Sequence, residues 1–120
     1  MSNMATKVQS ILLELFPSKP FPRVISEYYV KFKNTRLFFD FYLKELEVLI
    51  EIQGKQHTQF VKHFHEDMQA FYRQKSRDNL KIEYAEKHGK CLVRIYDTED
   101  VDRELVFKKI KIAMEEGFCE

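Results

Sequence analysis

The stretch that most constrains the fold is residues 37–57, which read LFFDFYLKELEVLIEIQGKQH. The pattern predicts two β-strands joined by a polar turn at 44–47, with the acids Asp40 and Glu51 among apolar neighbours. Side chains alternate between the two faces of a strand, so Phe38, Asp40 and Tyr42 are expected to share one face. When the strands fold back on each other, Asp40 comes close to Glu51 on the same side of the sheet.

Two neighbouring carboxylates in an apolar setting point to a bound cation. The pair would repel each other and lose hydration, which is costly unless something compensates. A divalent cation is the usual compensation, and hard oxygen ligands favour magnesium, manganese or calcium. Asp40 and Glu51 are therefore the first candidate metal ligands.

Length and composition predict a single domain spanning residues 1–120. The chain is 44% hydrophobic, with 11 Phe and 6 Tyr, as expected of a packed core and not of a disordered chain. No apolar run approaches the roughly 20 residues of a membrane span. The start lacks a signal-peptide layout and the two cysteines suggest no disulfide framework, so we expect an intracellular, cytoplasmic protein without a membrane partner. The net charge of +1 means that a nucleic-acid surface would have to come from local clustering.

Periodicity predicts the order α-β-β-β-α-β-α, an α/β fold with a central mixed sheet flanked by helices. The expected elements are a helix at 4–16, strands at 23–32, around 37–43 and around 48–53, a helix at 60–88, a strand at 91–96 and a helix at 99–116.

Side-chain placement in the helices is also predicted. In the last helix, Ile110 and either Ala113 or Met114 should point inward. The lysine pair at 108–109 should face solvent. In the long helix, Phe60, Phe64, Phe71 and Tyr72 are expected to be core or packing residues and not a surface for stacking bases.

The ordered motifs resemble the PD-(D/E)xK nuclease superfamily, and within it small phage and bacterial endonucleases related to very-short-patch repair and to some homing endonucleases. The motifs that carry the resemblance are DFY at 40–42, IEIQGKQH at 50–57, RD at 77–78 followed by Lys81 and Tyr84, and LVRI at 92–95. The resemblance covers about residues 23–96. It implies a restriction-endonuclease-like core, Mg²⁺-dependent hydrolysis of DNA with Mn²⁺ able to substitute, and a bacterial or phage-infected cell.

The resemblance also implies roles for particular residues. Asp40, Glu51 and the carbonyl of Ile52 would bind one or two Mg²⁺ ions against the scissile phosphate. Such an ion polarises the phosphoryl oxygen and lowers the pKa of a water molecule. Gln53 would orient that water or the phosphate, and His57 would shuttle a proton or bind phosphate.

Four further residues are the expected nucleic-acid contacts: Lys55, Gln56, Arg77 and Lys81. Arg77 and Lys81 are four residues apart on the predicted helix and share one of its faces. Their charges would neutralise backbone phosphates.

The chain departs from the superfamily pattern at two places. Gln53 replaces the lysine of the D/E-x-K motif, as in some restriction enzymes of the superfamily. Many members also carry a glutamate on the first helix, where Glu14 lies largely off the apolar face. Glu27 on the first predicted strand is the alternative third carboxylate, and the sequence does not choose between them.

The sequence is compatible with three functions. The leading one is a DNA endonuclease that has modest sequence preference, recognises a DNA structure, nicks, or forms a homodimer. Gln53 and the undecided third acid support a catalytically silent nucleic-acid-binding module on the same scaffold. A protein-binding regulator is the third, and an exposed aromatic patch without metal-binding acids would favour it.

Overall fold

The computed structural model describes residues 1–17, 22–54 and 65–120, except for the side chains of 65–67. The described residues follow the predicted order of elements, with one short strand added at the end. In chain order the elements are α1 (Asn3–Leu15), β1 (Val24–Phe32), β2 (Thr35–Leu43), β3 (Val48–Gln53), α3 (His65–Lys87), β4 (Cys91–Tyr96), α4 (Arg103–Glu116) and β5 (Phe118–Cys119).

The five strands form one mixed sheet in the order β1-β2-β3-β4-β5. Strands β1, β2 and β3 are an antiparallel meander, whereas β4 runs parallel to β3 and β5 parallel to β4. Parallel neighbours need a long crossover, and α3 lies in the connection between β3 and β4. The protein therefore belongs to the α/β class that its sequence pattern predicts.

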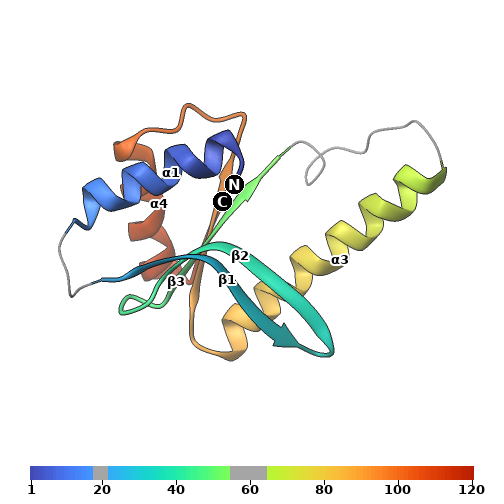
Figure 1. Ribbon diagram of the computed structural model, residues 1–120. Coiled ribbons are helices and arrows are strands. Elements are labelled where there is room, and N and C mark those ends of the chain that lie inside the picture. Colours follow the sequence, from blue (N-terminus) through green and yellow to red (C-terminus); the bar gives the residue numbers. More distant parts are fainter. Residues whose placement is uncertain (18–21, 55–64) are drawn as a thin grey trace.

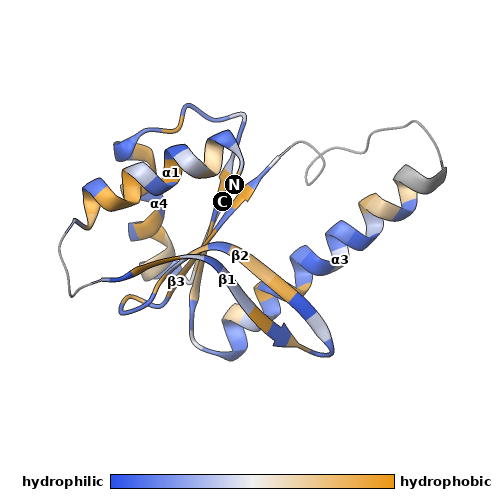
Figure 2. Ribbon diagram, viewed as in Figure 1, coloured by the Kyte–Doolittle hydropathy of each residue, from blue (hydrophilic) through white to orange (hydrophobic). Residues whose placement is uncertain are grey.

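The helices cover the two faces of the sheet separately. Helices α1 and α4 lie together on one side of the sheet and α3 on the other (Figure 1). On the α1/α4 side, Leu12 and Val106 pack with Ile50 of β3 in the larger core cluster. On the α3 side, Tyr84 packs with Leu49 in the smaller one. Hydrophilic residues predominate along α3, so only part of this helix contributes to the core (Figure 2).

Three predicted side-chain positions are settled by this packing. In α4 it is Ala113 that is buried, whereas Met114 is exposed. The prediction that Lys109 faces solvent is wrong: its Nζ is buried and donates to the carbonyl oxygen of Arg94 at 2.8 Å and to Glu99 Oε1 at 2.9 Å. Tyr72 is exposed and is not a core residue.

The alternation of faces in β1 and β2 is interrupted where Glu27 meets Asp40. The ladder pairs Ser26 with Phe41 and Tyr28 with Phe39 on either side of this point. Glu27 has a positive φ of 53°, which L-residues seldom adopt within a strand.

The interruption shifts the side-chain pattern of β2 by one residue. Leu37 and Phe39 pack on the α3 side, but Phe41 and Leu43 pack on the α1/α4 side. The register nevertheless continues one residue for one residue across this point, so neither strand carries an inserted residue. Tyr42 consequently packs on the α3 side, away from the hollow that Asp40 lines. The prediction that Asp40 and Tyr42 share one face is therefore wrong.

None of the helices in the described ranges is both long and apolar enough to cross a membrane.

Candidate functional site

Asp40 lies at the point where β2 and β3 separate. The ladder between these strands runs from Leu43–Val48 to Phe41–Ile50 and then stops. At the next position, Oδ2 of Asp40 accepts a hydrogen bond from the backbone N–H of Ile52 at 2.8 Å. The side chain thus takes the place of the backbone partner, and this holds the carboxylate against the Glu51–Ile52 peptide.

The carboxylate of Asp40 also borders an open hollow of about 480 Å³. Its lining comes from the start of α1, from β2, and from the ends of β3 and β4: Ser2, Asn3, Met4, Asp40, Ile52, Gly54 and Asp97. Asp97 is fixed there because its backbone N–H donates to the carbonyl oxygen of Gln53 at 3.0 Å. Side chains with oxygen atoms that could ligate a cation therefore predominate among the polar residues that line the hollow.

Glu51 points from β3 towards α3 and is almost completely buried. Its Oε2 accepts a hydrogen bond from Nζ of Lys81 on α3 at 2.8 Å. Loss of hydration raises the pKa of Glu51 to about 7, although the Lys81 ammonium acts in the opposite direction. The negative charges of Asp40 and Asp78 contribute to this raised pKa, so both carboxylates are near enough to act on Glu51.

Glu51 belongs to a buried polar cluster between the sheet and α3. Arg94 of β4 lies beside Glu51 in the parallel register, and its Nη2 donates to the backbone carbonyl of Asp78 at 3.1 Å. Leu49 and Leu92, two residues earlier on each strand, pack on the α3 side, which places Glu51 and Arg94 on that side too. The cluster consists of Glu51, Gln53, Asp78, Lys81 and Arg94, all no more than 9% exposed.

Two donors of this cluster have no hydrogen-bond partner among the described residues: Nε2 of Gln53 and Nε of Arg94. A buried donor without an acceptor costs about 1–3 kcal/mol. Native proteins rarely contain buried donors that lack an acceptor. An oxygen atom of a bound ligand is one acceptor that would complete these hydrogen bonds.

The Ile52 N–H holds Asp40 next to the Glu51–Ile52 peptide, but Asp40 lines the hollow beside α1, whereas Glu51 and Gln53 lie on the α3 side. The prediction that Asp40 and Glu51 lie on the same side of the sheet is therefore not confirmed. Lys81, which was predicted to contact nucleic acid at the surface, is buried against Glu51, whereas Arg77 is exposed. The predicted site residues Lys55, Gln56 and His57 lie outside the described residues.

The two candidates for the third carboxylate lie in different places. Glu14 is exposed on α1 and pairs with Arg103 of α4 at 2.9 Å. Glu27 is the residue of β1 that faces Asp40 in the register. In the described ranges, however, no three His, Cys, Asp or Glu side chains are grouped so that they could hold a metal ion.

Sequence reasoning gave no role to Asp78 and Arg94, which complete the buried cluster. Two signals were present. Arg94 is the only charge in the apolar run LVRI, and Asp78 comes three residues before Lys81, which places both on one helix face.

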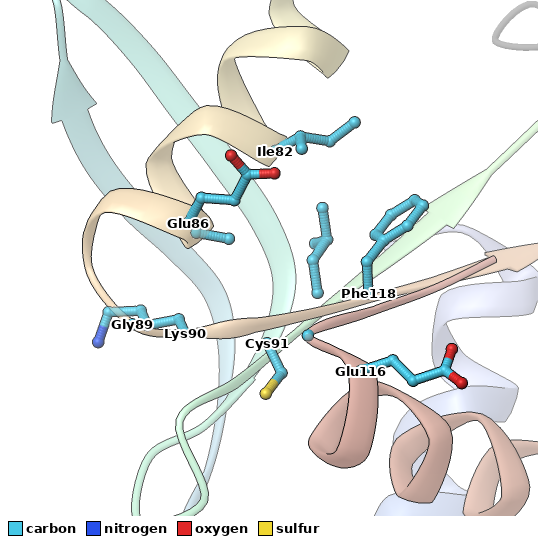
Figure 3. Close-up of a pocket in the computed structure, with 10 residues that line it drawn as sticks. Ile82, Glu86, Gly89, Lys90, Cys91, Glu116 and Phe118 are labelled. Carbon is cyan, nitrogen blue, oxygen red and sulfur yellow. The ribbon is translucent and has the colours of Figure 1, made fainter.

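A second hollow, of about 290 Å³, lies at the C-terminal end of α3 and is distinct from this site (Figure 3). Ile82 and Glu86 of α3 border it together with Cys91 of β4 and Phe118 of β5. Burial, and next the charge of Glu47, raises the pKa of the Cys91 thiol. A thiol with a raised pKa is a weak nucleophile, so this hollow offers no comparable chemistry.

Comparison with known proteins gives one relative of unknown activity. Over 79 residues the chain is 33% identical to uncharacterized protein 307L of Invertebrate iridescent virus 6. The match covers 65% of this chain and 40% of that protein, so the chain corresponds to less than half of its relative. No protein-family model matches the sequence. No solved structure matches it either.

Proposed function

We propose that the protein is a metal-dependent endonuclease that hydrolyses phosphodiester bonds in DNA. The observation that supports this most is the position of Asp40, whose carboxylate binds the Ile52 N–H directly beside the buried Glu51–Lys81 pair. The Asp40 carboxylate thus binds the Glu51–Ile52 peptide from β2, while the side chain of Glu51 and its lysine partner lie on the α3 side of the same strand. The element order and mixed sheet are compatible with a restriction-endonuclease-like core, which is part of the proposal.

The donor set fits Mg²⁺ or Mn²⁺, because carboxylate and carbonyl oxygens are the ligands that these ions prefer. Asp40, Glu51 and the carbonyl of Ile52 would hold the ion. When bound, it would stabilise the negative charge that develops on the phosphoryl group. In the reaction a water adds to phosphorus and one P–O ester bond breaks, leaving a hydroxyl and a phosphate monoester.

Lys81 would supply the positive charge that Gln53 lacks. The strand position of the motif lysine is occupied by Gln53, but the Lys81 ammonium reaches Glu51 from α3. Gln53 would donate a hydrogen bond from Nε2 to the phosphate or to the attacking water, since this donor has no partner in the described part of the chain. Glu27, opposite Asp40, is the better candidate for an additional acid than Glu14.

The second candidate function is a catalytically silent nucleic-acid-binding module. It is favoured by the same ion pair, because Lys81 already neutralises Glu51 and would compete with a metal ion for that carboxylate. Preference for a DNA structure belongs to the leading proposal and is tested by the choice of substrates. Dimerisation also belongs to it.

The test is cleavage of supercoiled plasmid, linear duplex, single strand and four-way junction with Mg²⁺, Mn²⁺ or EDTA. We expect Asp40→Asn and Glu51→Gln each to lower the cleavage rate by at least roughly a hundredfold, because both remove charge that the metal ion requires. Glu14→Gln is the matched control and should cut like the wild type. Undiminished cleavage by both site variants would refute the assignment, and no cleavage of any substrate would favour the silent module.

A further inference from the structure

One face of the far half of the β1–β2 hairpin is not covered by any helix in the described part of the chain. Tyr28, Val30 and Phe39 turn towards α3 and pack there. The residues between them point to the opposite face. Neither α1 nor α4 packs on that face, because the hairpin extends beyond both helices (Figure 1).

Two aromatic rings lie side by side on this bare face. Tyr29 and Phe38 are cross-strand partners, and their ring centroids are 5.1 Å apart. The residues are 46% and 55% exposed, respectively, which is unusual for large aromatic residues in a chain that buries Phe39 and Phe41 completely.

Two cations flank the rings on the same face. Lys31 and Arg36 form the cross-strand pair two positions further towards the tip of the hairpin, and both are exposed. Neither side chain has a hydrogen bond or ion pair with any residue in 1–17, 22–54 or 65–120. We call the four residues Tyr29, Lys31, Arg36 and Phe38 the hairpin platform.

We propose that the hairpin platform binds an unpaired stretch of the DNA strand, with bases stacked on Tyr29 and Phe38 and phosphates paired with Lys31 and Arg36. Exposed rings combined with cations are the features by which proteins hold single strands. A duplex keeps its bases stacked on each other, so the rings favour unpaired nucleotides. The proposal rests on the proposed function for the identity of the ligand as DNA.

The position of the platform relative to the candidate site supports this occupant. Phe38 precedes Asp40 by two residues on β2, so a strand lying on the platform would lead towards Asp40. Lys31 and Arg36 lie towards the tip of the hairpin. The acids Glu27 and Asp40 lie at the other end of the platform, two residues from Tyr29 and Phe38. A phosphate backbone would thus be held by the cations while the acids remain available for a metal ion.

The experiment measures binding of fluorescent oligo-dT by anisotropy in EDTA, so that cleavage does not interfere. Tyr29→Ala/Phe38→Ala should weaken binding by roughly tenfold or more, because each base–ring stack is lost. Tyr29→Phe/Phe38→Tyr keeps both rings and should bind like the wild type. Lys31→Ala/Arg36→Ala should reduce the slope of log affinity against log salt by about 1.4, since each phosphate contact on a single strand contributes about 0.7.

A matched control is available on α4, where exposed Phe107 lies near Lys111. Phe107→Ala/Lys111→Ala should leave binding unchanged. The proposal is overturned if the wild type does not bind oligo-dT, if the ring-less hairpin variant binds within twofold of it, or if the α4 control loses as much. It is also overturned if the ring-less hairpin variant changes the oligomeric state and leaves DNA binding unchanged. The two rings would then form a contact between two copies of the chain at the β1 edge.

The two proposals can fail separately. If Asp40→Asn abolishes cleavage while the ring-less hairpin variant still binds DNA, the platform is wrong and the nuclease stands. If binding depends on the platform but no substrate is cut, the nuclease is wrong and the platform stands.

Discussion

Glu51 is the residue whose surroundings are hardest to explain as structure alone. A carboxylate at 3% exposure loses most of its hydration, and one lysine at 2.8 Å restores only part of that loss. Asp40 and Asp78 add negative charge to the same region. Replacing such a pair with apolar residues is often neutral or stabilising, so its presence agrees with a role in binding or catalysis.

The raised pKa predicts how stability depends on pH. Folding raises the pKa of Glu51 from 4.5 to about 7, so between these values the folded state binds more protons than the unfolded state. The contribution of Glu51 to the free energy of unfolding is therefore most favourable below about pH 4.5 and falls as pH rises to about 7. The total loss is about 3 kcal/mol.

Urea unfolding of the wild type and Glu51→Gln across this pH range measures the effect. We expect the variant to lack the loss of stability that the wild type shows on going from acid to neutral pH. Glu14→Gln should keep the wild-type pH dependence. Parallel curves for the wild type and Glu51→Gln would show that Glu51 does not titrate in this range.

At the scale of elements, the interruption in β1 and β2 determines where the site lies. Both strands were predicted from their alternating patterns, but regular alternation gave Asp40 the wrong neighbours. Glu27 and Asp40 look like ordinary polar strand residues in the sequence, so nothing marks the interruption. The shift becomes visible only when Phe39 and Phe41 are seen to pack on opposite sides of the sheet.

Two substitutions at Asp40 separate its structural role from its chemical one. Asp40→Ala leaves the Ile52 N–H without its acceptor and should lower the free energy of unfolding by about 1–3 kcal/mol. Asp40→Asn keeps an oxygen acceptor and should be nearly as stable as the wild type, while losing the charge that a metal ion needs. Urea unfolding checks both variants. Equal destabilisation by Ala and Asn would mean that the 2.8 Å hydrogen bond is not what holds β2 to β3 here.

At the scale of the whole molecule, the sequence predicted the order of elements because periodicity distinguishes helices from strands locally. It did not predict β5, which has only two residues and exists because it pairs with β4. The Glu51–Lys81 contact spans 30 positions and depends on how the crossover lays α3 over the sheet. The burial of Lys109 likewise depends on Arg94 and Glu99 from other segments, which a helical pattern does not reveal.

The central claim is that Asp40 and Glu51 together bind a divalent cation, and calorimetric titration with Mn²⁺ tests it most directly. The wild type should bind Mn²⁺ at sub-millimolar concentration, and Asp40→Asn and Glu51→Gln should each weaken that binding by roughly tenfold or more. Glu14→Gln should bind like the wild type. Wild-type affinity in Asp40→Asn, or no Mn²⁺ binding by the wild type, would contradict the claim.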